Sequence, residues 1–159
     1  MVRELALTSL LACAPLAAHQ AFAACATVAP STQKQNALNE INRFRAQNGR
    51  APLCYNAKID SAAQWLANDM AAKNYFSHTD SLGRDGGRRL TDFGYTWSWW
   101  GENIAAGFSS WHGAIVDWEN SSGHRANLLS PNAKEIGLGQ AYNAGSTYGH
   151  YWTADFGAP

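Results

Sequence analysis

The 159-residue chain has no excess of charge of either sign, because twelve lysines and arginines balance twelve aspartates and glutamates. It also has no block of like charges and no internal repeat. A domain that binds nucleic acid is expected to carry a basic patch, and nothing in this sequence builds one. We therefore expect no nucleic-acid partner.

Long apolar runs are confined to the N-terminus. Arg3 precedes an apolar stretch at residues 5–18, and Ala21-Phe22-Ala23 has the small-x-small form of a cleavage site. The stretch is shorter than the roughly 20 residues that cross a bilayer. The pattern predicts a signal peptide at residues 1–23 and a secreted protein without a transmembrane segment.

A lipoprotein is the alternative at this end of the chain. Leu10-Leu11-Ala12-Cys13 resembles a bacterial lipobox, in which Cys13 would carry the lipid. The leader would then be unusually short, so cleavage and export are the preferred interpretation.

The sequence has only three cysteines, Cys13, Cys25 and Cys54. Cys13 leaves with the signal peptide, and an even pair in an oxidising compartment predicts one disulfide between Cys25 and Cys54. This bond would tie the N-terminal arm to the start of the second helical segment. A nucleophilic or metal-binding cysteine is the alternative, but neither residue has a histidine beside it in the sequence.

Helical periodicity comes first along the chain. Thr32 with Gln35 fits a capping box, and Gly49 is a natural stop signal. The apolar pattern predicts helices at residues 32–48 and 56–74, a short helix ending at Gly94, and a third major helix that starts after Ser110.

Strand periodicity comes last. Ile136 and Leu138 alternate with glycines, while Trp152, Ala154 and Phe156 alternate with Thr153 and Asp155. The pattern predicts an antiparallel hairpin whose loop lies at residues 145–149. Helices around a small antiparallel sheet make an α+β fold.

Three short motifs place imidazole or carboxylate groups among small residues: residues 74–79 contain His78, residues 101–107 contain Glu102, and residues 121–129 contain His124. Together they resemble the CAP superfamily of cysteine-rich secretory, antigen 5 and pathogenesis-related proteins, most closely its compact bacterial members. The resemblance implies a CAP domain at residues 36–157 after an arm at residues 24–35. It also implies a three-layer α-β-α sandwich with a third strand near residues 99–104.

The same resemblance implies that His78, Glu102 and His124 belong to a tetrad that lines a cleft. Longer members of the family carry the fourth residue, a glutamate, where this chain has Ser121. Glu119 is the candidate replacement, but neighbours on a helix point about 100° apart. Its place in the tetrad is therefore the least supported.

Two imidazoles at His78 and His124 make these residues the candidate ligands of a weakly bound Zn²⁺ or another divalent metal. Water would complete such a site, and Glu102 would be the catalytic residue that accepts a proton from that water, with Glu119 as a second candidate. The same residues also suit a hydrogen-bonded cluster that fixes the cleft.

Other catalytic patterns have less support. The sequence has no HExxH pair of the kind found in many zinc peptidases. A serine triad would use Ser121 or Ser122 with His124, but Gly123 favours a turn there.

Four tryptophans, Trp97, Trp99, Trp100 and Trp111, are expected mostly in the core. The alternative is an apolar or sugar-stacking wall beside Glu102. We expect a secreted monomer that binds an extracellular ligand, whether protein, polysaccharide or lipid, or interacts with the cell envelope. A metal-dependent hydrolase acting on peptides or envelope polymers is one alternative, and a protein that binds lipid or sterol is another.

Overall fold

The computed structural model describes residue 29 and residues 31–159. The predicted signal peptide, Cys13 and Cys25 lie outside these residues. Within the described part of the chain, no helix combines the length and the apolar character that crossing a membrane requires.

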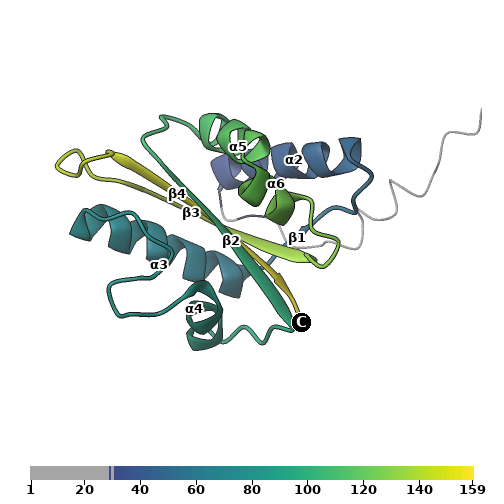
Figure 1. Cartoon of the computed structure of the whole chain (residues 1–159), viewed down its shortest axis with the longest axis horizontal. Coiled ribbons are helices and arrows are strands. Elements are labelled where there is room, and N and C mark those ends of the chain that lie inside the picture. The colour runs from purple at the N-terminus through teal and green to yellow at the C-terminus, as the bar shows by residue number, and fades with distance from the viewer. Residues whose placement is uncertain (1–28, 30) are drawn as a thin grey trace, which may run out of the picture.

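The described chain forms three layers (Figure 1). A four-stranded sheet lies in the middle, and the apolar clusters fill the spaces between it and the helices. One face is covered by α2 (Thr32–Gln47), α5 (Trp111–Asn120) and α6 (Ser122–Leu128). The other face is covered by α3 (Ala57–Lys73) and α4 (Gly86–Asp92). The expected α+β sandwich is therefore confirmed.

The strands are β1 (Cys54–Tyr55), β2 (Trp99–Ala106), β3 (Glu135–Tyr142) and β4 (His150–Ala158), in the spatial order β1-β3-β4-β2. β4 pairs antiparallel with both β3 and β2, as expected. β1, however, pairs parallel with β3, so the sheet is mixed and the expectation of a wholly antiparallel sheet is wrong at this edge. Two residues are too few to show the alternation that identifies a strand in a sequence.

The start of α2 lies close to its predicted position, but the cap differs. Ser31, and not Thr32, is the N-cap, and its hydroxyl accepts a hydrogen bond from the backbone N–H of Lys34. Gln35 does not close a capping box, because its side chain accepts a hydrogen bond from the backbone N–H of Ala29 instead.

A second local difference lies between α5 and α6. Ser121 alone separates the two helices, with an extended backbone at φ −92° and ψ 122°. The turn predicted at Gly123 is therefore wrong, because that residue lies inside α6.

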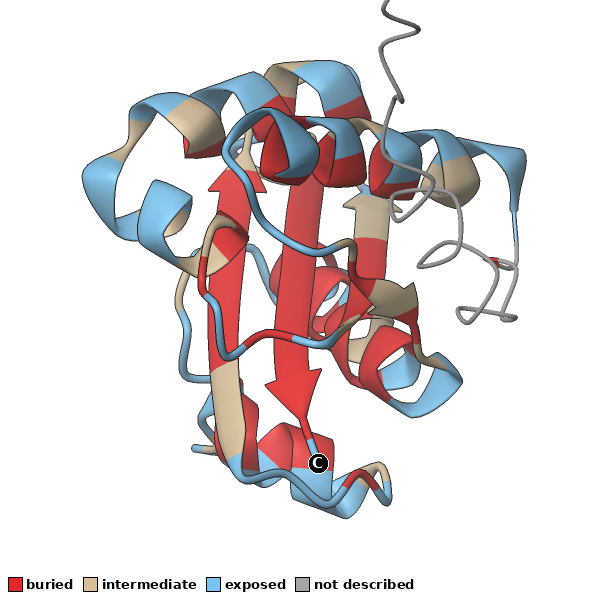
Figure 2. Ribbon diagram, turned by 90° about the vertical axis from the view of Figure 1, so that its right-hand side faces the viewer, coloured by how far each residue is buried: buried red, intermediate tan, exposed pale blue. Residues whose placement is uncertain are grey.

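β4 forms the centre of the core, because it lies between β3 and β2 and is covered on both faces. Its residues 151–158 are all buried (Figure 2). Trp152 and Phe156 pack in the cluster beneath α2 and α5, while Tyr151 packs against α3. The alternation predicted from the sequence thus separates the two halves of the core.

The four tryptophans expected in the core differ in burial. Trp111 is buried, Trp99 and Trp100 are half-buried, and Trp97 is 37% exposed. Trp97 remains at the surface, where its indole N–H donates to the backbone carbonyl of Gly87 at the start of α4.

α3 lies unusually close to β3. A Cβ atom at Gly137 would lie 2.0 Å from the backbone nitrogen of Asp60, and one at Gly139 would lie 2.2 Å from the carbonyl oxygen of Ala63. Only glycine permits this approach at either position.

β1 pairs with only the first two residues of β3. Beyond them, the close approach allows side chains of α3 to bond the outer edge of β3. Asp60 accepts a hydrogen bond from the backbone N–H of Leu138 (3.1 Å). The amide of Gln64 bonds both backbone groups of Gln140, accepting from the N–H (3.3 Å) and donating to the carbonyl (2.7 Å). This edge is therefore not open for pairing with another strand.

Candidate functional site

Glu102 lies at the middle of β2, the outer strand on one side of the sheet. Its neighbours at alternate positions, Trp100 and Ile104, pack in the clusters beneath α3 and α4, so Glu102 faces the same layer. Its side chain is only 2% exposed. A carboxylate this deeply buried requires hydrogen bonds or charge partners.

Two side chains engage the two carboxylate oxygens of Glu102. Nδ1 of His78 lies 2.7 Å from Oε1, and Nη2 of Arg89 donates to Oε2. His78 comes from the loop after α3, is 56% exposed, and presents its ring from the solvent side. Arg89 comes from α4 and is fully buried.

Arg89 also fixes the loop that carries His78. Its Nη1 donates to the backbone carbonyls of His78 (3.0 Å) and Arg84 (2.9 Å). A second acid, Asp80, lies 3.7 Å from the same nitrogen and accepts a bond from Arg84 Nε at 2.9 Å. The guanidinium therefore connects α4, the loop and β2 at one point. No sequence pattern predicts this role, because Arg88 and Arg89 look like a pair of surface charges.

Asp155 is a further buried acid, and the sequence motifs did not identify it. It is the direct register partner of Glu102 on β4, is 1% exposed, and faces the Glu102 carboxyl. Neither of its oxygens accepts a hydrogen bond from a donor among the described residues.

Burial raises the pKa of Asp155 well above its usual value, and the negative charge of Glu102 raises it further, against the opposing effect of Arg89. The arrangement favours a neutral Asp155 whose O–H donates to Glu102. The one sequence pattern that includes Asp155 is the alternation in β4, which places it on the face opposite Trp152, Ala154 and Phe156. Alternation is typical of a strand with one solvated face, however, whereas β4 lies at the centre of the sheet with both faces covered.

His124 approaches β2 from the opposite layer, on α6. Asn103 donates from its side chain to the backbone carbonyl of His124 (3.0 Å), and Asn127 bonds both the Asn103 side chain (2.9 Å) and the Glu102 carbonyl (3.2 Å). These bonds hold α6 against β2. His124 therefore lies on one side of this outer strand while His78 lies on the other.

The imidazole of His124 is partly buried, and its Nδ1 has no hydrogen-bond partner within the described chain. Burial lowers the pKa of His124, Asp117 opposes this shift, and His78 adds to it. His124 is therefore neutral at pH 7, the form that can ligate a metal. Because the charge of His78 affects the pKa of His124, the two imidazoles lie close enough to interact electrostatically.

Glu119 is not brought together with these three residues. Burial raises its pKa first and the charge of Glu40 on α2 raises it further, while Arg125 and His112 lower it. These neighbours place Glu119 toward α2, so no described interaction joins it to His78, Glu102 or His124.

The side chains near Glu102 offer few ligands for a metal ion. No group of three or more histidine, cysteine, aspartate or glutamate residues suited to a metal occurs among residue 29 and residues 31–159. His78 and His124 are the two available donors, since both oxygens of Glu102 are engaged. They do not amount to the three or four protein ligands of a built zinc site.

A three-layer sandwich that brings His78 and Glu102 together at its outer strand is the arrangement expected of a CAP domain. The comparisons with known proteins agree with this family assignment. The family described as the cysteine-rich secretory protein family, CAP, matches residues 38–156. The chain belongs to this family.

Two Bacillus subtilis proteins are similar to the chain. YkwD is 32% identical over 133 residues, covering 82% of the chain and 50% of YkwD. The membrane protein YlbC is 30% identical over 109 residues, covering 69% of the chain and 32% of YlbC. The chain thus spans half or less of the length of these relatives.

Solved structures show the same fold. An extracellular protein of Bacillus anthracis containing an SCP domain has a TM-score of 0.68 at 28% identity, covering 84% of the chain and 45% of that protein. An outer surface protein of Borrelia burgdorferi has a TM-score of 0.72 at 17% identity, covering 82% and 95% respectively. The second likeness concerns the fold alone.

Proposed function

We propose that the chain is an extracellular binding domain for a component of the cell envelope, and that Glu102 maintains the shape of the cleft that the family resemblance predicts. The predicted signal peptide supports a place outside the cell. The similar Bacillus anthracis protein is extracellular, which agrees with that place.

The observation that carries the proposal is the engagement of Glu102 on both oxygens. A general base needs a free lone pair within reach of the proton that it removes. Glu102 receives His78 on one oxygen and Arg89 on the other, faces Asp155, and is 2% exposed, so its remaining lone pairs are not open to a bound water. This environment suits a carboxylate that holds the loop of His78, α4 and β2 in one arrangement.

A metal-dependent hydrolase is the second candidate, and one observation favours it. A carboxylate on Nδ1 of a histidine is the usual way to orient the other ring nitrogen toward a metal, and Glu102 stands in this relation to the exposed His78. A weakly bound Zn²⁺ held by His78 and His124 would polarise water when present. Because these two donors do not make a built site, we derive no catalytic step from them.

Sedimentation with purified peptidoglycan sacculi tests the proposal. The pure protein should pellet with sacculi in a saturable manner and release no soluble fragments on long incubation. Release of soluble fragments that requires Zn²⁺ would instead support the hydrolase. A protein that neither pellets with sacculi nor cleaves them would contradict both candidate functions.

A further inference from the structure

A cavity lies on the opposite face of the sheet from Glu102. It has a volume of about 420 Å³ and is bounded by α2, the loop that leads into α5, and the ends of β3 and β4. We call it the α2–α5 cavity, and its wall includes Asn36, Glu40, Ser109, His112, Gln140 and His150. Its size falls within the range of small-ligand pockets. None of the four predicted tetrad residues lines it.

The wall carries polar side chains without partners in the protein. Asn36 and Gln140 make no side-chain hydrogen bond to another residue of the described chain, and neither does Ser109. Nδ1 of His150 is buried and likewise has no partner among the described residues. Asn36 and Ser109 are exposed and Gln140 is half-buried, so their polar groups are open to a ligand in the cavity.

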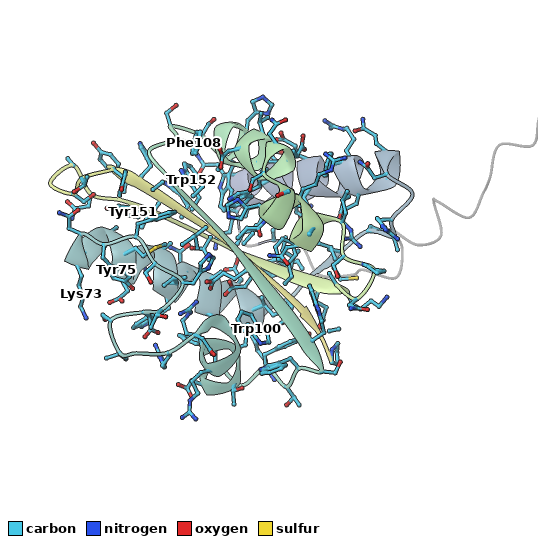
Figure 3. The ribbon with its side chains drawn as sticks, viewed as in Figure 1. Lys73, Tyr75, Trp100, Phe108, Tyr151 and Trp152 are labelled. Atoms are coloured by element: carbon cyan, nitrogen blue, oxygen red, sulfur yellow. The ribbon has the colours of Figure 1, made fainter. Side chains whose placement is uncertain are left out.

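A row of aromatic rings leads from Tyr142, which is exposed beside the cavity, to the lining residues His150, Trp152 and Trp111. The ring of Tyr142, 61% exposed, lies 4.5 Å from that of His150. His150 stacks on Trp152 at 5.9 Å with an angle of 13° between the planes, and Trp152 meets the buried Trp111 at 4.8 Å. Figure 3 shows Trp152 beside Phe108, whose carbonyl accepts from the Trp152 indole N–H at 2.9 Å.

The charges of the cavity favour a neutral ligand. No lysine or arginine lines it, and its one acid, Glu40, lies 2.6 Å from Nδ1 of His112, its neighbour on the wall. A phosphate or a fatty-acid carboxylate would find no free cation among the residues of this wall. The wall is partly apolar, through Trp111 and Trp152, and partly polar. An acyl chain or a sterol would cover the apolar part but would strip water from the amides without replacing their hydrogen bonds.

The closed edge of β3 disfavours a peptide. Extended peptides usually bind by adding a strand to an open sheet edge. Both backbone groups of Gln140, the β3 residue in the cavity, are already bonded to Gln64. Recognition must therefore use side chains and rings. A sugar matches them, since its hydroxyls bond amides while its C–H faces pack on aromatic rings.

We propose that the α2–α5 cavity binds a neutral saccharide, with Tyr142, whose ring lies against the lining residue His150, as the stacking residue and Asn36 and Gln140 as hydrogen-bonding residues. The site is separate from Glu102 and its partners His78 and Arg89. The inference therefore does not rest on the role proposed for that residue.

Isothermal titration with three neutral probes, chitotetraose, cellotetraose and maltotetraose, tests this site. We expect saturable binding of at least one. Asn36→Ala and Tyr142→Ala should each weaken it about three- to tenfold, the effect of losing one hydrogen bond or one ring contact. The matched controls are Asn39→Ala, an exposed amide on the same helix, and Tyr148→Ala, an exposed tyrosine of the same hairpin that packs toward Phe76. Both should bind as the parent does.

Absence of saturable binding by all three saccharides would overturn the proposal, as would equal affinity in the parent and both cavity variants. Weakening in the control variants to the same extent would also overturn it, because the saccharide would then bind elsewhere. Palmitate binding that Tyr142→Ala abolishes, without any saccharide binding, would assign the cavity to lipid instead. Sedimentation with sacculi separates this inference from the proposed function, because Asn36→Ala and Tyr142→Ala leave the surroundings of Glu102 unaltered. Cavity variants that lose the saccharide but still pellet with sacculi would show that the envelope is bound elsewhere on the domain.

Discussion

Glu102 and Asp155 face each other as register partners on β2 and β4, and both carboxyl groups are buried. Arg89 supplies one positive charge to Glu102, so a neutral Asp155 leaves the three groups without net charge. Glu102 is thus held by a histidine, an arginine and a second acid. Its surroundings resemble a structural junction more than a site for proton transfer from water.

The raised pKa of Asp155 predicts how stability changes with pH. An acid whose folded pKa lies above its unfolded value stabilises the fold fully below the unfolded pKa of about 3.9, and this stabilisation is lost as the pH rises toward the folded pKa. Asp155→Asn keeps a donor to Glu102 and does not titrate. The variant should therefore melt above the parent at pH 7, and the difference should shrink toward pH 4.

Thermal unfolding from pH 4 to pH 8 checks this prediction, with the exposed Asp117→Asn as the control. A pH-independent difference between Asp155→Asn and the parent would mean that Asp155 is ionised in the folded protein.

Arg89 should matter far more than its neighbour on α4. Arg89→Met leaves Glu102 buried beside Asp155 without its cation and should cost about 3–5 kcal/mol of unfolding free energy. Arg88→Met removes an exposed ion pair with Asp92 and should cost less than about 1 kcal/mol. Urea unfolding of the two variants measures both values. Similar costs would show that the Glu102–Arg89 pair does not organise the site.

The pairing of Cys25 with Cys54 remains a prediction, because Cys25 lies outside the described residues. In an oxidising compartment the bond should lower the entropy of the unfolded chain, so Cys54→Ala should lose about 3–4 kcal/mol under the chain-entropy account. Mass spectrometry of the natively secreted protein should find no free thiol on either residue. Two free thiols would rule the bond out.

Zinc should bind weakly through His78 and His124, and more weakly at acidic pH because a protonated imidazole cannot ligate. Isothermal titration should show no saturable binding to the double variant His78→Ala, His124→Ala. The control is His112→Ala, an exposed histidine at the start of α5 that contacts Glu40 on α2. Unchanged zinc affinity in the double variant would place the metal elsewhere.

Much of the fold could be predicted from local patterns. The observed α2 (Thr32–Gln47) and α3 (Ala57–Lys73) lie within one residue of the predicted helices, because caps and apolar stripes are properties of neighbouring residues. The layering followed from the family resemblance. The parallel pairing of β1 could not be predicted, since a two-residue strand is defined only by its partner β3.

The site was harder to predict, because its polar groups meet across the sheet. The family motifs identified His78 and Glu102. They could not show that Arg89 and Asp155 are buried beside them. Arg89 is buried because α4 packs on β2, and Asp155 is buried because β4 is a central strand of the sheet. Glu119 is the opposite case: it is close to the His124 motif in the sequence, but in the structure it lies toward α2.

Glu102→Gln tests the central claim most directly, through unfolding temperature and turnover measured on the same preparations. The substrates are a panel of peptides, peptidoglycan and esters, and Glu119→Gln serves as the comparison variant. The substitution keeps the shape of the side chain but removes the charge that pairs with Arg89. We predict a clear fall in melting temperature for Glu102→Gln, little change for Glu119→Gln, and no turnover by the parent with or without Zn²⁺. Reproducible turnover by the parent that falls by roughly 10² or more in Glu102→Gln at an unchanged melting temperature would contradict the account and make Glu102 a general base.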